Sequence, residues 1–262
     1  FLSVPLAVAA EQPVSEGETV LDCESGRILH ERNADARLPM ASTTKILTAV
    51  IILEDCDLSA VVTVPAEAAG TEGSSIYLQA GEKICVLDLL YGLMLRSGND
   101  CAVTLALHHS DTLDAFAACM NERAQGMGAE NSCFKNPHGL PAEGHCTTAR
   151  DLARITAYAL RNSTFREIVS AREWRTECEG TETLRVFHNK NKMLYSYEGA
   201  DGVKTGFTKE AGRCLVSAAE REGMQLVCVV LNSPAMYERS AELLDGCFAG
   251  YTRTCLFDAE TY

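Results

Sequence analysis

The sequence predicts an α/β protein of the α+β class, with an antiparallel sheet assembled from both ends of the chain, covering helices, and a helical lobe inserted between the two ends. Strand-like segments separated by turn signals gather near both ends of the 262-residue chain. Segments with the apolar spacing of amphipathic helices fill the middle instead. The composition, 47% hydrophobic and 23% charged, is that of an ordinary globular domain.

Each end of the chain contains a predicted β-hairpin with glycine in its turn. Near the start, residues 19–22 and 27–30 flank one such turn. Near the other end, residues 214–218 and 226–230 flank a second. The segment 202–206, bounded by glycines, is expected to form a further strand beside the second hairpin.

Three helices have recognisable boundaries. Asp111 is the predicted N-cap of a helix that ends at Gly126. Thr148 and Asp151 have the spacing of a capping box at the start of another helix. A last helix, beginning near Pro234, is expected to cover the sheet. Its predicted apolar face consists of Met236, Leu243, Leu244, Cys247 and Phe248.

The charge and the cysteines exclude several kinds of partner. A net charge of −13 and the lack of a Lys/Arg cluster argue against nucleic acid. None of the twelve cysteines has Cys-x-x-Cys spacing, so neither a zinc site nor a redox site is expected. Most of them are predicted to be buried thiols. No metal or cofactor is indicated.

Three short motifs occur in order along the chain. They are Ser42-x-x-Lys45, Ser97-x-Asn99 and Lys204-Thr205-Gly206. Each is weak alone, because Ser is a common helix cap and Ser, Gly and Asn are common turn residues. Their local contexts are therefore what indicates chemistry.

Ser42 directly precedes the apolar run 46–51, so it is expected at the first turn of a buried helix, where free backbone NH groups favour developing negative charge. Lys45 shares its helix face. To act as a base, Lys45 needs a pKa lowered from about 10.4 toward 7, at a cost of about 4 to 5 kcal/mol. Burial and a second cation, for which Lys204 is the candidate, would lower it. The alternative is that Ser42 is only an N-cap and Lys45 a solvated lysine.

The trio resembles the signature of class A β-lactamases and penicillin-binding proteins. The surrounding segments resemble the low-molecular-mass D-alanyl-D-alanine carboxypeptidases of the peptidase S11 family, from residue 20 to about 250. They are residues 38–45, 97–100, 136–140, 147–153 and 199–208. The resemblance implies a β-lactamase/DD-peptidase-like fold, an acyl-enzyme on Ser42, release of D-alanine from peptidoglycan stem peptides, and covalent inhibition by β-lactam antibiotics. It also implies a location outside the cytoplasm, in the bacterial cell envelope.

The resemblance assigns roles to the other two motifs. Ser97 would relay a proton to the leaving amine, and Asn99 would hold a substrate amide. Lys204 and Thr205, on an edge strand, would meet the terminal carboxylate of a peptide lying alongside as an added strand. Gly206 would permit close approach of the backbone.

Further site residues also follow from the resemblance. The backbone NH groups of Ser42 and Phe207 would bind the acyl oxyanion. His138 and Asp151 would support the site, although each has an equal alternative as a capped loop residue. Arg239 is a candidate for an additional contact to the substrate carboxylate.

The chain is expected to form one transpeptidase-like catalytic domain over residues 11–262, after a remnant of a secretory signal at 1–10. The alternative for the first ten residues is an apolar strand. The sheet lobe is predicted over about 16–58 and 195–262, and the helical lobe over about 59–194. No stretch has the roughly 18 apolar residues needed to span a bilayer, so membrane anchoring would require a segment outside this sequence.

Two other functions compete with this prediction. A class A β-lactamase would need a Glu-x-x-Leu-Asn element, and none occurs between Asn99 and Lys204. A catalytically silent wall-binding or sporulation protein would keep the cleft for recognition only. That alternative is disfavoured because a binder gains nothing from a costly lysine with a lowered pKa.

Overall fold

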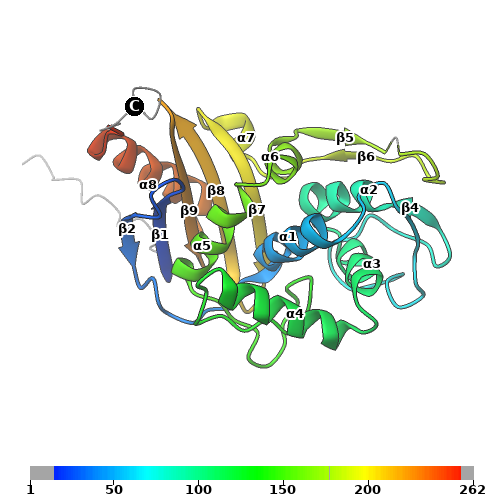
Figure 1. Cartoon of the computed structure of the whole chain (residues 1–262). Helices are drawn as coiled ribbons and strands as arrows, with labels where there is room; N and C mark the ends of the chain where they lie inside the picture. The colour runs from blue at the N-terminus through cyan, green and yellow to red at the C-terminus, as the bar shows by residue number, and fades with distance from the viewer. Residues whose placement is uncertain (1–14, 177, 255–262) are drawn as a thin grey trace, which may run out of the picture.

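The computed structural model describes residues 15–176 and 178–254, so the predicted signal remnant at 1–10 lies outside the described residues. Its main feature is a five-stranded antiparallel sheet in the order β2-β1-β9-β8-β7 (Figure 1). The strands are β1 (Gly17–Asp22), β2 (Ile28–Arg32), β7 (Ala200–Thr208), β8 (Gly212–Arg221) and β9 (Met224–Leu231). The predicted α+β class, with a sheet made by both chain ends, is confirmed.

The two ends of the chain meet where β1 pairs with β9. Val20 lies opposite Cys228 at the middle of this pairing. The β8–β9 hairpin turns at Glu222 and Gly223, which both have positive φ, of 51° and 75°. Two such residues match the twist of a two-residue hairpin loop. The order leaves β7 at one edge of the sheet.

Helices cover both faces of the sheet. α8 (Met236–Gly250) packs on β8 and β9, and its buried side chains share an apolar cluster with both strands. This confirms the predicted final helix. On the other face, α5 (Ala149–Ala159) packs on β1 and β9, and α6 (Ser163–Ser170) packs on β7. The sheet therefore lies between two helical layers.

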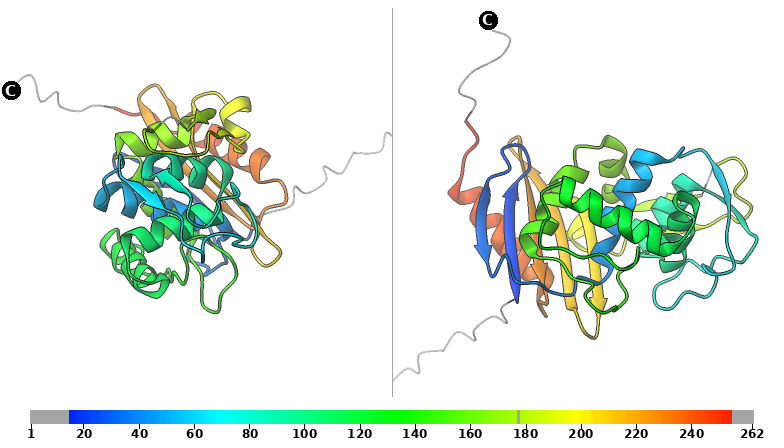
Figure 2. Two further views of the ribbon diagram at one scale, coloured as in Figure 1. Left: turned by 90° about the vertical axis from the view of Figure 1, so that its right-hand side faces the viewer. Right: turned by 60° about the horizontal axis from the view of Figure 1, so that its bottom comes forward.

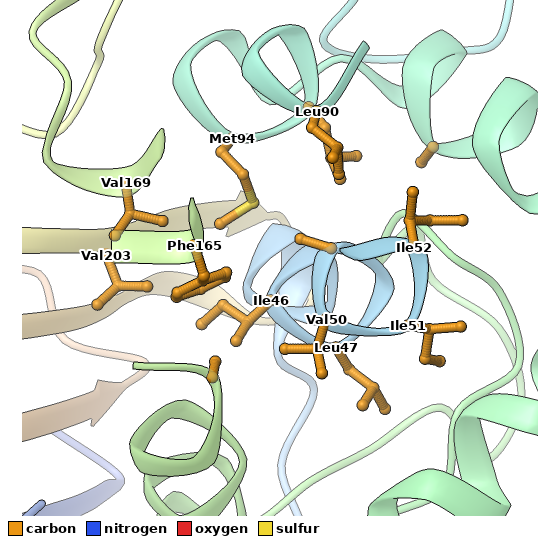
Figure 3. Packing of buried hydrophobic residues seen from close by; sticks show 14 of the residues in the cluster. Ile46, Leu47, Val50, Ile51, Ile52, Leu90, Met94, Phe165, Val169 and Val203 are labelled. Carbon is orange, nitrogen blue, oxygen red and sulfur yellow. The ribbon is translucent and has the colours of Figure 1, made fainter. Parts of the chain in front are cut away.

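α1 (Lys45–Asp55) is the central helix of the molecule. Its residues from Lys45 to Ile52 are all buried, as expected for a helix that is apolar on every side. Figure 3 shows its side chains meeting Leu90 and Met94 on one side, and Phe165, Val169 and Val203 on another. Because α1 touches both the sheet and the other helices, it holds its first turn at the boundary between them.

Most of the remaining elements lie on the side of α1 away from β1 and β2 (Figure 2), but the two short helices at 41–44 and 193–196 pack on β7. The helices are η1 (Ala41–Thr44), α2 (Val86–Tyr91), η2 (Gly92–Arg96), α3 (Asn99–His109), α4 (Leu113–Gly126) and α7 (Met193–Ser196). Two small sheets pair β3 (Val61–Thr63) with β4 (Lys83–Cys85), and β5 (Glu173–Arg175) with β6 (Val186–His188). No described helix is both long and apolar enough to cross a membrane.

Three local predictions need correction or comment. The N-cap of α4 is Thr112, whose hydroxyl accepts from the Ala115 NH, and not Asp111. Thr148 caps α5 as predicted, but the Asp151 carboxylate accepts hydrogen bonds from residues 131 and 132 instead of completing a capping box. The predicted lobe boundaries stay a prediction, although α5 and α6, from the segment assigned to the helical lobe, pack on the sheet.

Candidate active site

Ser42 lies in the 3₁₀ turn η1, just before α1, where the sequence predicted the first turn of an α-helix. Ala41 precedes it with a positive φ of 49°, which turns the chain sharply into the helix. The Lys45 amine donates to the Ser42 hydroxyl at 3.1 Å. The predicted proximity of the two side chains is therefore present, and the tighter 3₁₀ turn still places both on one side.

The Lys45 amine has two further acceptors, Asn99 Oδ1 and the His138 carbonyl oxygen, each at 2.6 Å. A neutral amine has two hydrogens and one lone pair. If the two short contacts take both hydrogens, the lone pair faces the third neighbour, the Ser42 hydroxyl. This arrangement suits an amine that removes the proton of Ser42.

The pKa of Lys45 is held well below its usual value, first by burial and next by the positive charge of Lys204. Lys204, on β7, is itself buried, and its amine donates to the Thr205 carbonyl at 2.8 Å. Burial, followed by the charge of Lys190, lowers the pKa of Lys204 to about 7. The first and third motifs therefore lie close enough in space for their two amines to influence each other.

Asn99 begins α3, after a turn in which Ser97 adopts a left-handed conformation with φ 64°. Both polar atoms of the Asn99 amide make hydrogen bonds: Nδ2 donates to the Glu72 carbonyl at 2.6 Å, and Oδ1 accepts from Lys45. In this arrangement Asn99 positions the Lys45 amine, a function that its predicted contact to a substrate amide did not include.

Gly206 brings β7 against the turn of Ser42. A Cβ on Gly206 would lie 3.0 Å from the Ser42 nitrogen and 3.1 Å from the Ala41 Cβ. The residue that follows, Phe207, is 63% exposed at the edge of the sheet. A side chain here would be tightly crowded, so glycine favours the approach, and the backbone of β7 and the backbone of Ser42 border the same space.

The loop that contains His138 and Gly139 packs against the turn of Ser42, and of this loop only His138 was predicted as a site residue. His138 contributes its carbonyl oxygen to Lys45, whereas its imidazole Nδ1 accepts from the Leu140 NH at 3.1 Å. Burial, and then the charge of Lys45, lower the pKa of His138 to about 3, so its ring is neutral at neutral pH. Gly139 packs so tightly that a Cβ there would lie 1.9 Å from the Ala41 oxygen.

Two predicted support residues lie elsewhere. Asp151 accepts from the Asn131 NH at 2.8 Å and from the Ser132 hydroxyl at 2.9 Å, so it fastens a loop. Arg239, proposed as a carboxylate ligand, is on α8 and donates two hydrogen bonds of 2.9 Å to Glu18 of β1. An internal carboxylate thus already pairs with the Arg239 guanidinium, which argues against the predicted contact to the substrate carboxylate; that contact stays a prediction.

We expect Arg239→Met to destabilise the protein without slowing its reaction with penicillin. Burial would raise the pKa of the Glu18 carboxyl, but hydrogen bonds, first from Arg239, hold it well below its usual 4.5. Losing a partner of such a buried pair costs about 3 kcal/mol, or roughly 5 to 10 °C in Tm. The variant's loss of stability relative to the wild type should be complete above pH 4.5 and should become smaller at lower pH, because Glu18 becomes protonated there. A slower acylation in a folded variant would contradict this assignment.

Lys190 is a third cation that sequence reasoning missed, because it belongs to none of the motifs. We expect Lys190→Met to raise the pKa of Lys204 and of Lys45, since the variant removes a positive charge that lowers both. The acid limb of the acylation rate should then move to higher pH by on the order of half a unit. The matched control is Lys192→Met, at an exposed lysine two residues away. Equal shifts in both variants, or none, would exclude the effect.

The described residues also contain one group with the ligand types of a metal site. Atoms of Asp55, His109 and Cys119 lie within 4.8 Å of one another. Both carboxylate oxygens of Asp55 already accept from Arg123, at 2.5 and 2.6 Å. The group lies at the end of α1 opposite Lys45, so it takes no part in the site.

Comparison with known proteins identifies the family of this chain. The family model described as D-alanyl-D-alanine carboxypeptidase (peptidase S11) matches residues 6–235. D-alanyl-D-alanine carboxypeptidase DacF of Bacillus subtilis is 34% identical over 90% of this chain and 63% of its own length. DacC of Escherichia coli is 34% identical over 89% of this chain and 62% of its own. The chain thus spans less than two thirds of the length of these two relatives.

Solved structures agree in fold. The crystal structure of the Streptomyces K15 DD-transpeptidase has a TM-score of 0.85 and 32% identity, and the match covers 92% of this chain and 100% of that one. The D-alanyl-D-alanine carboxypeptidase DacD of Francisella tularensis has a TM-score of 0.86 and 26% identity over 100% of this chain and 76% of its own. The predicted DD-peptidase-like fold is confirmed. The chain belongs to the peptidase S11 family of D-alanyl-D-alanine carboxypeptidases.

Proposed function

We propose that this protein is a serine D-alanyl-D-alanine carboxypeptidase that removes the terminal D-alanine from peptidoglycan stem pentapeptides. One observation carries the proposal: the Lys45 amine lies 3.1 Å from the Ser42 hydroxyl, with both of its other contacts taken by acceptors. A lysine with a lowered pKa in this position is the base that a serine nucleophile requires.

In the proposed reaction, the Ser42 oxygen attacks the carbonyl carbon of the penultimate D-alanine while its proton passes to Lys45. Ser97 relays the proton to the nitrogen of the terminal D-alanine, the peptide bond breaks, and free D-alanine leaves. Water then attacks the acyl-serine ester, which releases the shortened peptide and restores the Ser42 hydroxyl. Each step is an acyl transfer, in which two positioned groups handle the proton.

The contacts of β7 support the proposed mode of substrate binding. β7 is an edge strand, so a peptide can pair with it as an added strand. Lys204 and Thr205 would receive the terminal carboxylate, and the NH groups of Ser42 and Phe207 would bind the oxyanion. The close approach of Gly206 to the Ser42 nitrogen supports this pairing of donors. A bound carboxylate would favour the charged form of Lys204, whose pKa lies near 7 without substrate.

We further infer that the protein acts on the outer face of the cytoplasmic membrane or as a secreted enzyme, where its trimming of stem peptides contributes to peptidoglycan synthesis and cell shape. Its relatives are named for carboxypeptidase activity, and one structural neighbour is titled a DD-transpeptidase. Water and an amine are thus alternative acceptors for the same acyl-enzyme.

Release of D-alanine from a synthetic peptide ending in D-Ala-D-Ala tests the proposal. We expect release from this peptide and none from the same peptide ending in L-Ala-L-Ala. Penicillin should form a stable covalent adduct on the tryptic peptide that contains Ser42. Many turnovers of penicillin per second would identify a penicillin-destroying enzyme instead. Binding of the D-Ala-D-Ala peptide without hydrolysis or acylation would identify a silent wall-binding protein.

A further inference from the structure

Cys133 and Cys146 lie directly opposite each other in an antiparallel β-bridge. The Cys133 NH donates to the Cys146 oxygen at 2.8 Å, and the Cys146 NH donates back at 3.0 Å. Residues that exchange both hydrogen bonds have Cα atoms about 5.5 Å apart. Disulfides are formed across Cα separations of about 4.4 to 6.8 Å. The Cα separation of this pair therefore falls within the range that disulfides span.

The loop between the two cysteines, residues 134–145, packs against the turn that contains Ser42. Within it, Gly139 packs on the Ala41 carbonyl, and the His138 carbonyl accepts from the Lys45 amine at 2.6 Å. The loop also contains His145, whose Nε2 lies 2.9 Å from the Thr44 hydroxyl. Any bond that joins the two ends of this loop restrains all three contacts together.

Both cysteines are accessible to reagents. Each is half-buried, and Cys146 borders an open depression together with Pro39, His145 and Glu210. Burial raises the pKa of the Cys146 thiol above its usual value, and the charge of Arg37 acts in the opposite direction. Because the thiolate is the reactive form, thiol exchange at Cys146 should speed up as the pH rises above neutral.

We propose that Cys133 and Cys146 form a reversible disulfide, made by exchange with a small disulfide oxidant, that locks loop 134–145 against the turn of Ser42. One thiolate attacks the oxidant, forming a mixed disulfide and releasing the first small thiolate. The second cysteine thiolate attacks the protein sulfur of that mixed disulfide and releases the second. The two protein thiols lose two electrons and two protons, and the oxidant is reduced to two small thiols.

The position in the bridge makes the bond reducible. Residues directly opposite each other have Cβ atoms about 4.5 to 5.5 Å apart, with hydrogen-bonded pairs at the wider end, whereas a relaxed disulfide prefers about 3.8 Å. The closed form is therefore strained, and strained disulfides are the ones that are readily reduced. The pair thus acts as a switch that responds to the thiol-disulfide balance of its surroundings, and the unbonded form remains a folded protein.

The test is oxidation of the full chain with oxidised glutathione at pH 8, followed by peptide mapping by mass spectrometry without reduction. We expect a linked pair of peptides containing Cys133 and Cys146. The Tm should rise on oxidation, by less than the roughly 10 °C that closure of an unstrained loop of this length implies, and dithiothreitol should reverse the rise. Deuterium exchange of the 134–145 amides should slow in the oxidised form.

Cys133→Ser and Cys146→Ser should each abolish the linkage and the rise in Tm, while Cys56→Ser, at another half-buried cysteine, should keep both. A wild-type protein without this linkage, or with Cys133 linked elsewhere, would overturn the proposal. So would a linkage that leaves the Tm and the exchange of 134–145 unchanged. If a serine variant fails to fold, differential alkylation of the oxidised and reduced wild-type protein decides the question. None of these measurements requires peptidase activity, so failure of the proposed function would be seen separately.

Discussion

Ser42→Ala is expected to lower the rate of D-alanine release by at least about 10⁴-fold and to eliminate the covalent penicillin adduct. The variant removes the atom to which the acyl group would be bonded, and no nearby group replaces it. Alanine should be tolerated here because the N-cap of η1 is Met40, so the Ser42 hydroxyl, which accepts from Lys45, does not cap this turn. The measurements are D-alanine release under saturating peptide and intact-protein mass after incubation with penicillin.

The matched control is Ser170→Ala, at an exposed serine near the end of α6. It should retain the wild-type rate and the adduct. Unchanged binding of the peptide by Ser42→Ala would show that the cleft is intact. Residual release within about tenfold of the wild type would mean that another residue is the nucleophile, and the proposed reaction would have to be abandoned.

Lys45→Met is expected to lower the rate of penicillin acylation by about 10³-fold, because it removes the base while filling nearly the same space. Methionine has no charge to bury, so the variant does not carry the desolvation cost that lowers the pKa of Lys45. It does leave Asn99 Oδ1 and the His138 oxygen without their donor. Because these two effects on stability oppose each other, the variant should still fold, and its defect should lie in the acylation step.

The matched control is Lys209→Met, at an exposed lysine beyond β7. Its acylation rate should equal that of the wild type. The two variants should also differ in their pH profiles, since the acid limb should be present in Lys209→Met and absent from the residual rate of Lys45→Met. A normal acylation rate in a folded Lys45→Met variant would refute the assignment of Lys45 as the base.

Much of the site was predictable because its parts are encoded over short distances. The i, i+3 spacing of Ser42 and Lys45 places both side chains on one side of a turn, whichever helix type forms. The resemblance assigned a close backbone approach to Gly206 before the partner backbone was known. The hairpin of β8 and β9 was predictable from a turn that needs two positive φ angles.

What the sequence could not predict concerns contacts that only the folded chain creates. Arg239 has the charge of a carboxylate ligand, but β1 places the Glu18 carboxylate against it, more than two hundred positions away. Lys190 carries no motif and matters only because it is close enough to Lys204 to lower its pKa. The absence of Cys-x-x-Cys spacing argued against a redox site, yet a β-bridge brings Cys133 and Cys146 together across an intervening loop.

By itself, the sequence determined the class of fold, the proximity of Ser42 to the Lys45 amine, and, through the resemblance of its motifs, the family to which the chain belongs. The fold class and the proximity of the two side chains follow from periodicity and spacing, which depend on local backbone geometry, whereas the family follows from the resemblance of the motifs and the segments around them. Only the tertiary structure decided which groups surround the Lys45 amine, which cations lower its pKa, and which internal charges are already paired. Burial and Coulombic attraction depend on distance in space, and that distance is set when β7, α1 and the 134–145 loop pack together.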